Sequence, residues 1–145
     1  MKPKICIVGS RYYPEILRKL MLGATIELKK NGITYKTRLV DKKIYVSGIF
    51  EIPVTIAKNI KFYDAFIALG CVIKGKTPHF DFISNAVTNA IMHLSITHKK
   101  PIGNGIITCL NKKQAFERAN PKKRNKGGEA ARAILSVLGI IKSQW

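Results

Sequence analysis

The fold of this chain is decided by the stretch AFIALGCVIKGKTPHFD, residues 65–81. Its first five residues form a continuous apolar run of strand length, and the residues from about Phe82 to His98 repeat apolar side chains at helical spacing. The segment between them is polar, so the order is strand, turn and helix. In open parallel α/β sheets, ligands bind at the carboxyl ends of strands, where such turns lie. Residues 70–81 are therefore the first candidate site.

The turn carries residue types that suit a phosphorylated ligand. It holds Gly75, the lysines Lys74 and Lys76, Thr77, and His79 just before the predicted helix. Backbone N–H groups at a helix start favour an anion, and histidine accepts and returns protons near neutral pH. The pattern predicts a phosphorylated substrate and acid–base chemistry. The alternative is an exposed polar loop in which the histidine caps the helix.

Strand-like and helix-like segments alternate along the rest of the chain. Before the decisive stretch come a strand over Lys4–Gly9, a helix over Pro14–Lys30, an edge strand over Thr34–Val40, and a turn over Val46–Pro53 that opens a helix to about Asn59. After it come a strand over Ile102–Thr108, a short helix over Lys112–Arg118, a basic loop over Asn120–Gly128 and a last helix from about Glu129. Such alternation implies a parallel sheet covered by helices on both faces. We predict one domain, residues 1–145, with a flavodoxin-like three-layer α/β/α fold and a four-stranded parallel sheet in the order 2-1-3-4.

The composition is strongly basic. The 145 residues include 26 Lys and Arg against 8 Asp and Glu, a net charge of +18, which favours anionic partners: nucleic acid, a membrane surface or a phosphorylated metabolite. No apolar run reaches the ~20 residues that span a bilayer. Residues 1–5 lead directly into a strand-like run, without the pattern of a signal peptide. We expect a cytoplasmic protein that does not insert into a membrane.

The three cysteines, Cys6, Cys71 and Cys109, each lie in or beside an apolar strand-like run. They form no Cys-x-x-Cys pair, so we expect no zinc site. Small buried thiols in a reducing compartment are the expected role. Because Cys71 borders the polar turn, a nucleophilic cysteine is the alternative.

Three other segments carry candidate binding residues. Tyr12 and Tyr13 follow the first strand and can stack on a flat heterocycle, or they can simply be partly buried tyrosines. Glu51 can accept hydrogen bonds from ligand hydroxyls, or it can complement a helix dipole. Arg118 and Lys126 can bind phosphate, the arginine in a bidentate way; the alternative for both is a solvated surface cation.

Several motifs together resemble those of the lumazine synthase family, in the order and spacing of that family and over essentially the whole chain. The motifs are Gly48–Pro53 (GIFEIP), Gly70–Gly75 (GCVIKG), Thr77–Asp81 (TPHFD), Glu117–Ala119 (ERA) and Asn125–Gly127 (NKG). The resemblance implies a transferase of riboflavin biosynthesis. The implied reaction condenses 5-amino-6-(D-ribitylamino)uracil with 3,4-dihydroxy-2-butanone 4-phosphate to give 6,7-dimethyl-8-ribityllumazine, phosphate and water, the penultimate step of the pathway.

The resemblance also assigns residues. It implies that His79 is the general acid/base, and that Tyr12 and Asn104 lie at the pyrimidine ring. The remaining implied contacts are Ile49, Phe50 and Glu51 for the ribityl chain, Cys71, Val72 and Ile73 for the uracil, and Lys76, Thr77 and Arg118 for the phosphate, with Lys126 as an additional candidate. It implies no cofactor. It implies a homopentamer with sites between subunits, a shell of twelve pentamers (sixty subunits) in some members, and a functional link to riboflavin synthase.

The sequence departs from the family pattern in two places that bear on the site. Asn104 stands where the family usually has an aromatic residue, and an amide stacks less well on a heterocycle. The segment Asn120–Arg124 is more basic than the family's usual glycine-rich loop. We therefore expect the chemistry to be retained, whereas the ring stacking and the assembly size stay open.

Two functions of other classes are the alternatives. The charge of +18 suits a nucleic-acid-binding module, but its lysines and arginines are spread along the chain and no RNA- or DNA-binding motif is present. We therefore expect no specific nucleic-acid partner. A shell protein of the same fold without catalysis is the second alternative, and the presence of His79, Glu51 and Arg118 argues against it.

Overall fold

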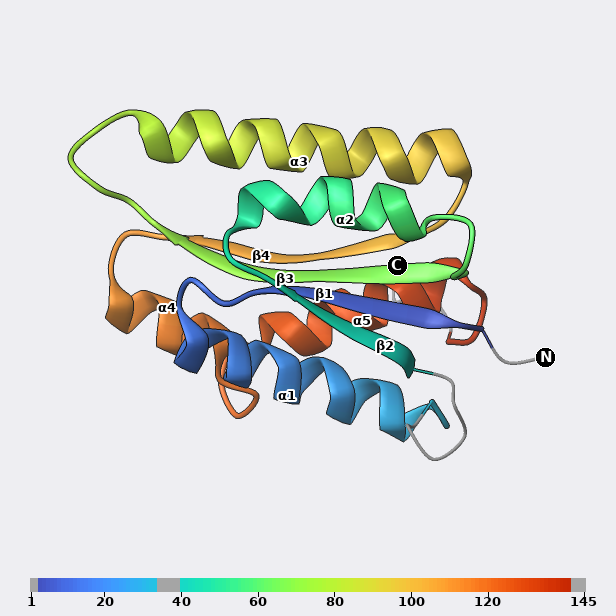
Figure 1. The fold of residues 1–145 in the computed structure, drawn as a ribbon. Helices are drawn as coiled ribbons and strands as arrows, with labels where there is room; N and C mark the ends of the chain where they lie inside the picture. Colours follow the sequence, from blue (N-terminus) through green and yellow to red (C-terminus); the bar gives the residue numbers. More distant parts are fainter. Residues whose placement is uncertain (1–2, 34–39, 142–145) are drawn as a thin grey trace.

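The computed structural model describes residues 3–33 and 40–141, and it shows a four-stranded sheet between two layers of helices (Figure 1). The strands are β1 (Ile5–Ser10), β2 (Val40–Val46), β3 (Ala65–Ile73) and β4 (Ile102–Cys109). All neighbouring strands pair in parallel, in the order β2-β1-β3-β4. The predicted fold class and strand order are confirmed.

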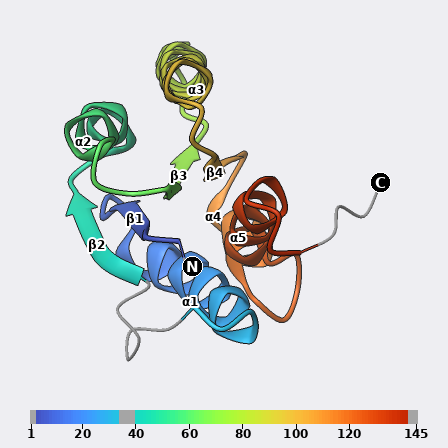
Figure 2. The ribbon, with the colours of Figure 1, turned by 90° about the vertical axis from the view of Figure 1, so that its right-hand side faces the viewer.

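Helices cover both faces of the sheet, as Figures 1 and 2 show from two directions. The helices are α1 (Pro14–Lys30), the 3₁₀ turn η2 (Ile49–Glu51), α2 (Ile52–Asn59), α3 (His79–His98), α4 (Lys112–Ala119) and α5 (Lys126–Val137). Helices α2 and α3 form one layer, and α1, α4 and α5 form the other. No helix in the described part of the chain combines the length and the apolar content of a membrane span.

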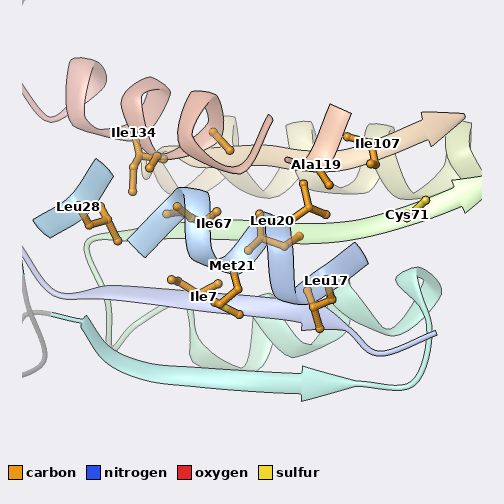
Figure 3. Packing of buried hydrophobic residues seen from close by; sticks show 14 of the residues in the cluster. Ile7, Leu17, Leu20, Met21, Leu28, Ile67, Cys71, Ile107, Ala119 and Ile134 are labelled. Atoms are coloured by element: carbon orange, nitrogen blue, oxygen red, sulfur yellow. The ribbon is translucent and has the colours of Figure 1, made fainter. Parts of the chain in front are cut away.

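The central strands β1 and β3 are apolar along almost their whole length because both of their faces are covered. In β1, Ile5 and Ile7 belong to the core under α1 and α5, whereas Cys6 and Val8 belong to the core under α2. Strand β3 alternates in the same way, with Ile67 on the first side. Figure 3 shows this core, with side chains of α1, α5 and the strands in contact. A doubly covered parallel strand therefore reads as a continuous apolar run.

Element boundaries differ from the sequence prediction at three places. Strand β3 continues four residues beyond Leu69, because residues 70–73 pair with residues 106–109 of β4. Helix α3 begins at His79 and not near Phe82. Helix α5 begins at Lys126 and not near Glu129, because the side chain of Asn125 accepts a hydrogen bond from the Gly128 N–H at 3.2 Å and caps the helix there.

The second strand was predicted over Thr34–Val40, and residues 34–39 of it lie outside the described residues. The described strand β2 is Val40–Val46. It pairs with β1 along one side only, at the end of the sheet order. Its sequence, VDKKIYV, contains three charged residues, as is common for an edge strand. Because the strand contains no continuous apolar run, the apolar pattern of the sequence does not indicate it.

Candidate active site

The carboxyl ends of β1 and β3 border a cavity of about 330 Å³. Segments that follow these strands, together with η2 and the first turn of α3, complete its wall. The lining residues are Tyr12, Tyr13, Gly48, Ile49, Phe50, Cys71, Val72, Ile73, Gly75, Thr77, His79, Phe80 and Ile83. The cavity thus lies at the carboxyl end of the parallel sheet, where open α/β folds bind ligands. We refer to it as the His79 cavity.

Two exposed aromatic rings form part of the wall of the His79 cavity. Tyr12 is 69% exposed and Phe50 is 64% exposed. The ring of Tyr12 lies 4.9 Å from that of Tyr13 in an edge-to-face arrangement, and the Tyr12 N–H donates to Ser10 Oγ at 3.4 Å. These contacts hold Tyr12 at the cavity while its outer face stays open. An open aromatic face of this kind can stack on a flat heterocycle.

His79 is the first residue of α3, and its side chain is exposed at the cavity. The N-cap position is taken by Pro78, with no capping hydrogen bond from a side chain. The imidazole therefore does not cap the helix, in contrast to the alternative considered from the sequence. The His79 N–H lies 3.4 Å from Thr77 Oγ1, its acceptor. The side chain is thus available to exchange protons with a bound ligand.

Cys71 lies in the floor of the His79 cavity as a protonated thiol. Only 6% of the residue is exposed. Burial, followed by the neighbouring thiol of Cys109, raises the pKa of Cys71 to about 12. Because only the thiolate is a strong nucleophile, the alternative of a nucleophilic cysteine has no support from the geometry. The residue is a small packing group between the core and the cavity.

A second cavity, of about 350 Å³, lies between β4, α4 and α5. Its lining residues are Asn104, Ile106, Ile107, Thr108, Arg118, Arg124, Lys126 and Glu129. The guanidinium of Arg118 donates from Nη1 to the carbonyl oxygen of Thr108 at 2.6 Å, and Lys126 Nζ lies 3.1 Å from Glu129 Oε2. Three cations face this space, which suits an anionic ligand. We refer to it as the Arg118 cavity.

Comparison with known proteins gives the family. The 6,7-dimethyl-8-ribityllumazine synthase family matches residues 2–142. A protein of that name, numbered 1, from Rhodopseudomonas palustris is 44% identical over 144 residues, which cover 94% of this chain and 85% of the relative. The chain belongs to the lumazine synthase family. The protein of the same name from Bartonella tribocorum is 42% identical, over 97% of this chain and 91% of the relative. The one from Agrobacterium fabrum is 40% identical, over 97% of this chain and 96% of the relative.

Most of the residues assigned through the lumazine synthase resemblance lie at one of the two cavities. Those at the His79 cavity are Tyr12, Ile49, Phe50, Cys71, Val72, Ile73, Thr77 and His79. Asn104, Arg118 and Lys126 line the Arg118 cavity. The two cavities share no lining residue. One copy of the chain therefore presents the predicted site as two separate halves.

Glu51 and Lys76 line neither cavity. The carboxylate of Glu51 accepts a hydrogen bond from Ser47 Oγ at 3.1 Å, which holds it beside the start of η2. Lys76 is exposed in the turn between β3 and α3.

Some lining residues were not predicted as site residues from the sequence. Phe80 and Ile83 line the His79 cavity, and Ile83 falls within the helix predicted over about Phe82 to His98. Arg124 and Glu129 line the Arg118 cavity. Glu129 had a usable signal, since it lies three residues after Lys126, at the spacing of a helical ion pair. No group of three or more His, Cys, Asp or Glu side chains in the described part of the chain is arranged to hold a metal ion.

Proposed function

We propose that this chain condenses 5-amino-6-(D-ribitylamino)uracil with 3,4-dihydroxy-2-butanone 4-phosphate to give 6,7-dimethyl-8-ribityllumazine, phosphate and water, the penultimate step of riboflavin biosynthesis. The observation that carries the proposal is an exposed histidine in a cavity walled by open aromatic rings, in a chain that matches the lumazine synthase family over residues 2–142. The chain acts as a single domain, residues 1–145, in the cytoplasm, with no cofactor or metal.

The pyrimidine substrate binds at the His79 cavity. The ring of Tyr12 stacks on the heterocycle, and the end of β3, residues 71–73, offers backbone N–H and C=O groups to the uracil edge. Residues 49–51 contact the ribityl chain, and Glu51 accepts hydrogen bonds from its hydroxyls. The exposed ring of Tyr12 and the fixed position of the Glu51 carboxylate beside Ser47 support these roles.

The phosphate of the second substrate is held by Lys76, Thr77 and Arg118, with Lys126 as an additional contact. Arg118 is suited to this because one nitrogen of its guanidinium is fixed on the Thr108 carbonyl while the rest of the group faces the cavity. Its planar fork then binds phosphate oxygens in a bidentate way. Thr77 offers a hydroxyl in the turn just before α3.

Catalysis combines alignment of two substrates with proton transfer by His79. The amine of the pyrimidine attacks the ketone of the butanone phosphate, and the phosphate later leaves before ring closure. Both steps need a proton to be removed at one atom and supplied at another, which a neutral imidazole and its protonated form perform. Holding two reactants in the correct geometry gives effective molarities of ~10⁵ M or more. A positioned acid/base adds roughly 10²–10⁴-fold.

The active form is a homopentamer in which neighbouring subunits complete each site. The separation of the His79 and Arg118 cavities within one chain supports this, because residues assigned to one reaction would otherwise act apart. Asn104 then faces the heterocycle from the neighbouring subunit. The pentamer is either the final assembly or the unit of a sixty-subunit shell of twelve pentamers. The lumazine product is the substrate that passes to riboflavin synthase.

The test is a lumazine-formation assay with purified protein and both substrates, followed by product absorbance and mass. We expect stoichiometric formation of the lumazine and of inorganic phosphate, with no activity when either substrate is omitted. A folded protein that binds neither substrate and forms no product would overturn the proposal and would favour a shell protein without catalysis. Binding to nucleic acid that is tight and resists salt would favour the other alternative.

A further inference from the structure

The Arg118 cavity contains more positive charge than the residues predicted from the sequence explain. Arg118, Arg124 and Lys126 face Glu129 across it. Glu129 is already paired with Lys126, at 3.1 Å. Neither arginine has a carboxylate within ion-pair distance among the residues that the structure describes. Two guanidinium groups therefore face the same space without a balancing anion.

The backbone fixes Arg124 at this cavity. The Arg124 N–H donates to the Glu117 carbonyl in the last turn of α4 at 3.3 Å. The next residue, Asn125, donates from its N–H to the Asn120 carbonyl at 3.1 Å and begins α5 with a left-handed backbone at φ 46°. The loop between the two helices is thus closed on both sides of Arg124. Its side chain is exposed and lines the cavity, whereas Lys122 and Lys123 in the same loop are exposed and do not line it.

Arg118 by itself leaves much of a phosphate group unsatisfied. One of its nitrogens is committed to the Thr108 carbonyl at 2.6 Å. A phosphate monoester carries about −1.5 to −2 charges at neutral pH and has three strong acceptor oxygens. A second guanidinium in the same cavity supplies both further donors and the second positive charge. Arg124 is the described residue that meets this requirement without an existing ion-pair partner.

We propose that Arg124 is a specificity-determining residue for the phosphorylated substrate, which it binds together with Arg118. The inference rests on the proposed function, because it assigns the Arg118 cavity to the phosphate group. Arg124 contacts the phosphate from the outer edge of the cavity, after the fixed guanidinium of Arg118 has oriented it. Its effect falls on the binding of one substrate and leaves the proton transfer at His79 unchanged.

The experiment compares Arg124→Ala with Lys123→Ala, which removes the same charge from the adjacent exposed position outside the cavity. We expect Arg124→Ala to raise the KM for 3,4-dihydroxy-2-butanone 4-phosphate about 10-fold. This is the lower end of the range of effects for losing a charge-assisted hydrogen bond, because Arg124 is exposed. The KM for the pyrimidine and kcat should change less than about twofold, and Lys123→Ala should match the wild type. Arg124→Lys should restore part of the loss, and the wild-type KM should rise more steeply with salt than that of Arg124→Ala.

The outcomes separate this inference from the assignments on which it rests. If Arg124→Ala matches Lys123→Ala while Arg118→Ala raises the KM for the phosphorylated substrate, the role of Arg124 is overturned and the phosphate assignment stands. If neither arginine variant changes that KM, the phosphate assignment is wrong as well. Calorimetry with the phosphorylated substrate alone, without the pyrimidine, measures the same loss of affinity in the absence of turnover. Unchanged sedimentation and thermal unfolding would confirm that Arg124→Ala remains folded and assembled.

Discussion

His79 and Cys71 line the same cavity, but the protein surrounds their side chains differently. The imidazole is exposed at the first turn of α3. Only 6% of Cys71 is exposed, and burial raises the pKa of its thiol to about 12. A group that stays protonated at neutral pH cannot serve as a general base there. We therefore propose the histidine, and not the thiol, as the proton-transfer group of this cavity.

We predict that His79→Ala lowers the turnover rate by roughly 10–10³-fold without abolishing it, because aligned substrates react slowly without the proton shuttle. The wild-type rate should depend on pH in a way that the variant lacks, because a proton shuttle must be in the correct protonation state to act. The measurement is kcat against pH for both proteins. His93→Ala is the matched control, since His93 is exposed on the same helix and lines neither cavity. An unchanged turnover and pH profile in His79→Ala would move the role to Lys126.

Cys71 gives a prediction about alkaline stability. Its folded pKa of about 12 lies above the reference value of 9.0 that applies to the unfolded chain. Below pH 9 both states hold the proton and stability does not depend on this thiol. Between pH 9 and 12 the unfolded state releases the proton first, so the free energy of unfolding falls as pH rises.

Urea unfolding at pH 8 and at pH 10.5 measures this effect. The wild type should lose more stability than Cys71→Ser by roughly 1–2 kcal/mol, given about 1.36 kcal/mol for each pH unit. Titrating groups that do not interact with Cys71, such as Cys6, are present in both proteins and cancel in the comparison. Equal losses in the two proteins would show that Cys71 is not held protonated by the fold.

At the scale of elements, α5 carries Lys126 to the Arg118 cavity by packing unusually close to its neighbours. A Cβ added to Gly127 would lie 2.0 Å from the Leu20 carbonyl oxygen of α1. A Cβ added to Gly103 of β4 would lie 2.4 Å from the Ala130 carbonyl oxygen of α5. Only a glycine fits where backbones approach this closely. The position of α5 therefore depends on the absence of two side chains.

We predict that Gly127→Ala lowers the free energy of unfolding by about 1–3 kcal/mol, because α1 and α5 must move apart and lose packing. Gly75→Ala is the control, since nothing lies within 4 Å of the Cβ that it would add. Denaturant unfolding of both variants gives the comparison. If Gly127→Ala were as stable as the wild type, the close approach of α5 and α1 would be wrong.

At the scale of the whole molecule, α3 has apolar side chains on two opposite faces. Val87 and Ile91 are its fully buried residues, facing the sheet. Phe82, Met92 and Ile96 are 70%, 59% and 68% exposed. A helix that is apolar on both sides is normally covered on both sides. The outer face of α3 therefore suits contact with further copies of the chain.

We predict that Met92→Asp combined with Ile96→Asp breaks the assembly and lowers activity, because the His79 and Arg118 cavities then no longer meet between subunits. Two charges in an apolar contact are left unpaired, which opposes association. Leu22→Asp is the control: this apolar residue is 51% exposed and lies on α1, in the opposite helical layer. Sedimentation velocity run alongside kinetics gives both readouts. Fully active wild-type monomers would refute the assembly.

The sequence alone determined the fold class and the family of this protein. Apolar runs at residues 5–8 and 65–69 identify strands buried on both faces, and this identification depends only on local composition and length. Several motifs together, with the one around His79 among them, indicated the family, and both results are confirmed. Residues 41–46 of the edge strand β2 were not predicted as strand, because a charged strand that pairs on one side only has no strong local sequence signal.

The tertiary structure alone decided how the candidate residues are grouped. Arg118 and Lys126 were predicted as phosphate ligands, but no local pattern in the sequence separates them from the His79 cavity or places Arg124 beside them. It also left Cys71 open as a nucleophile until its burial was known. Periodicity reports which face of an element is apolar. The distances between elements, and the solvent around each side chain, follow from how the elements pack, which depends on contacts between residues far apart in the chain.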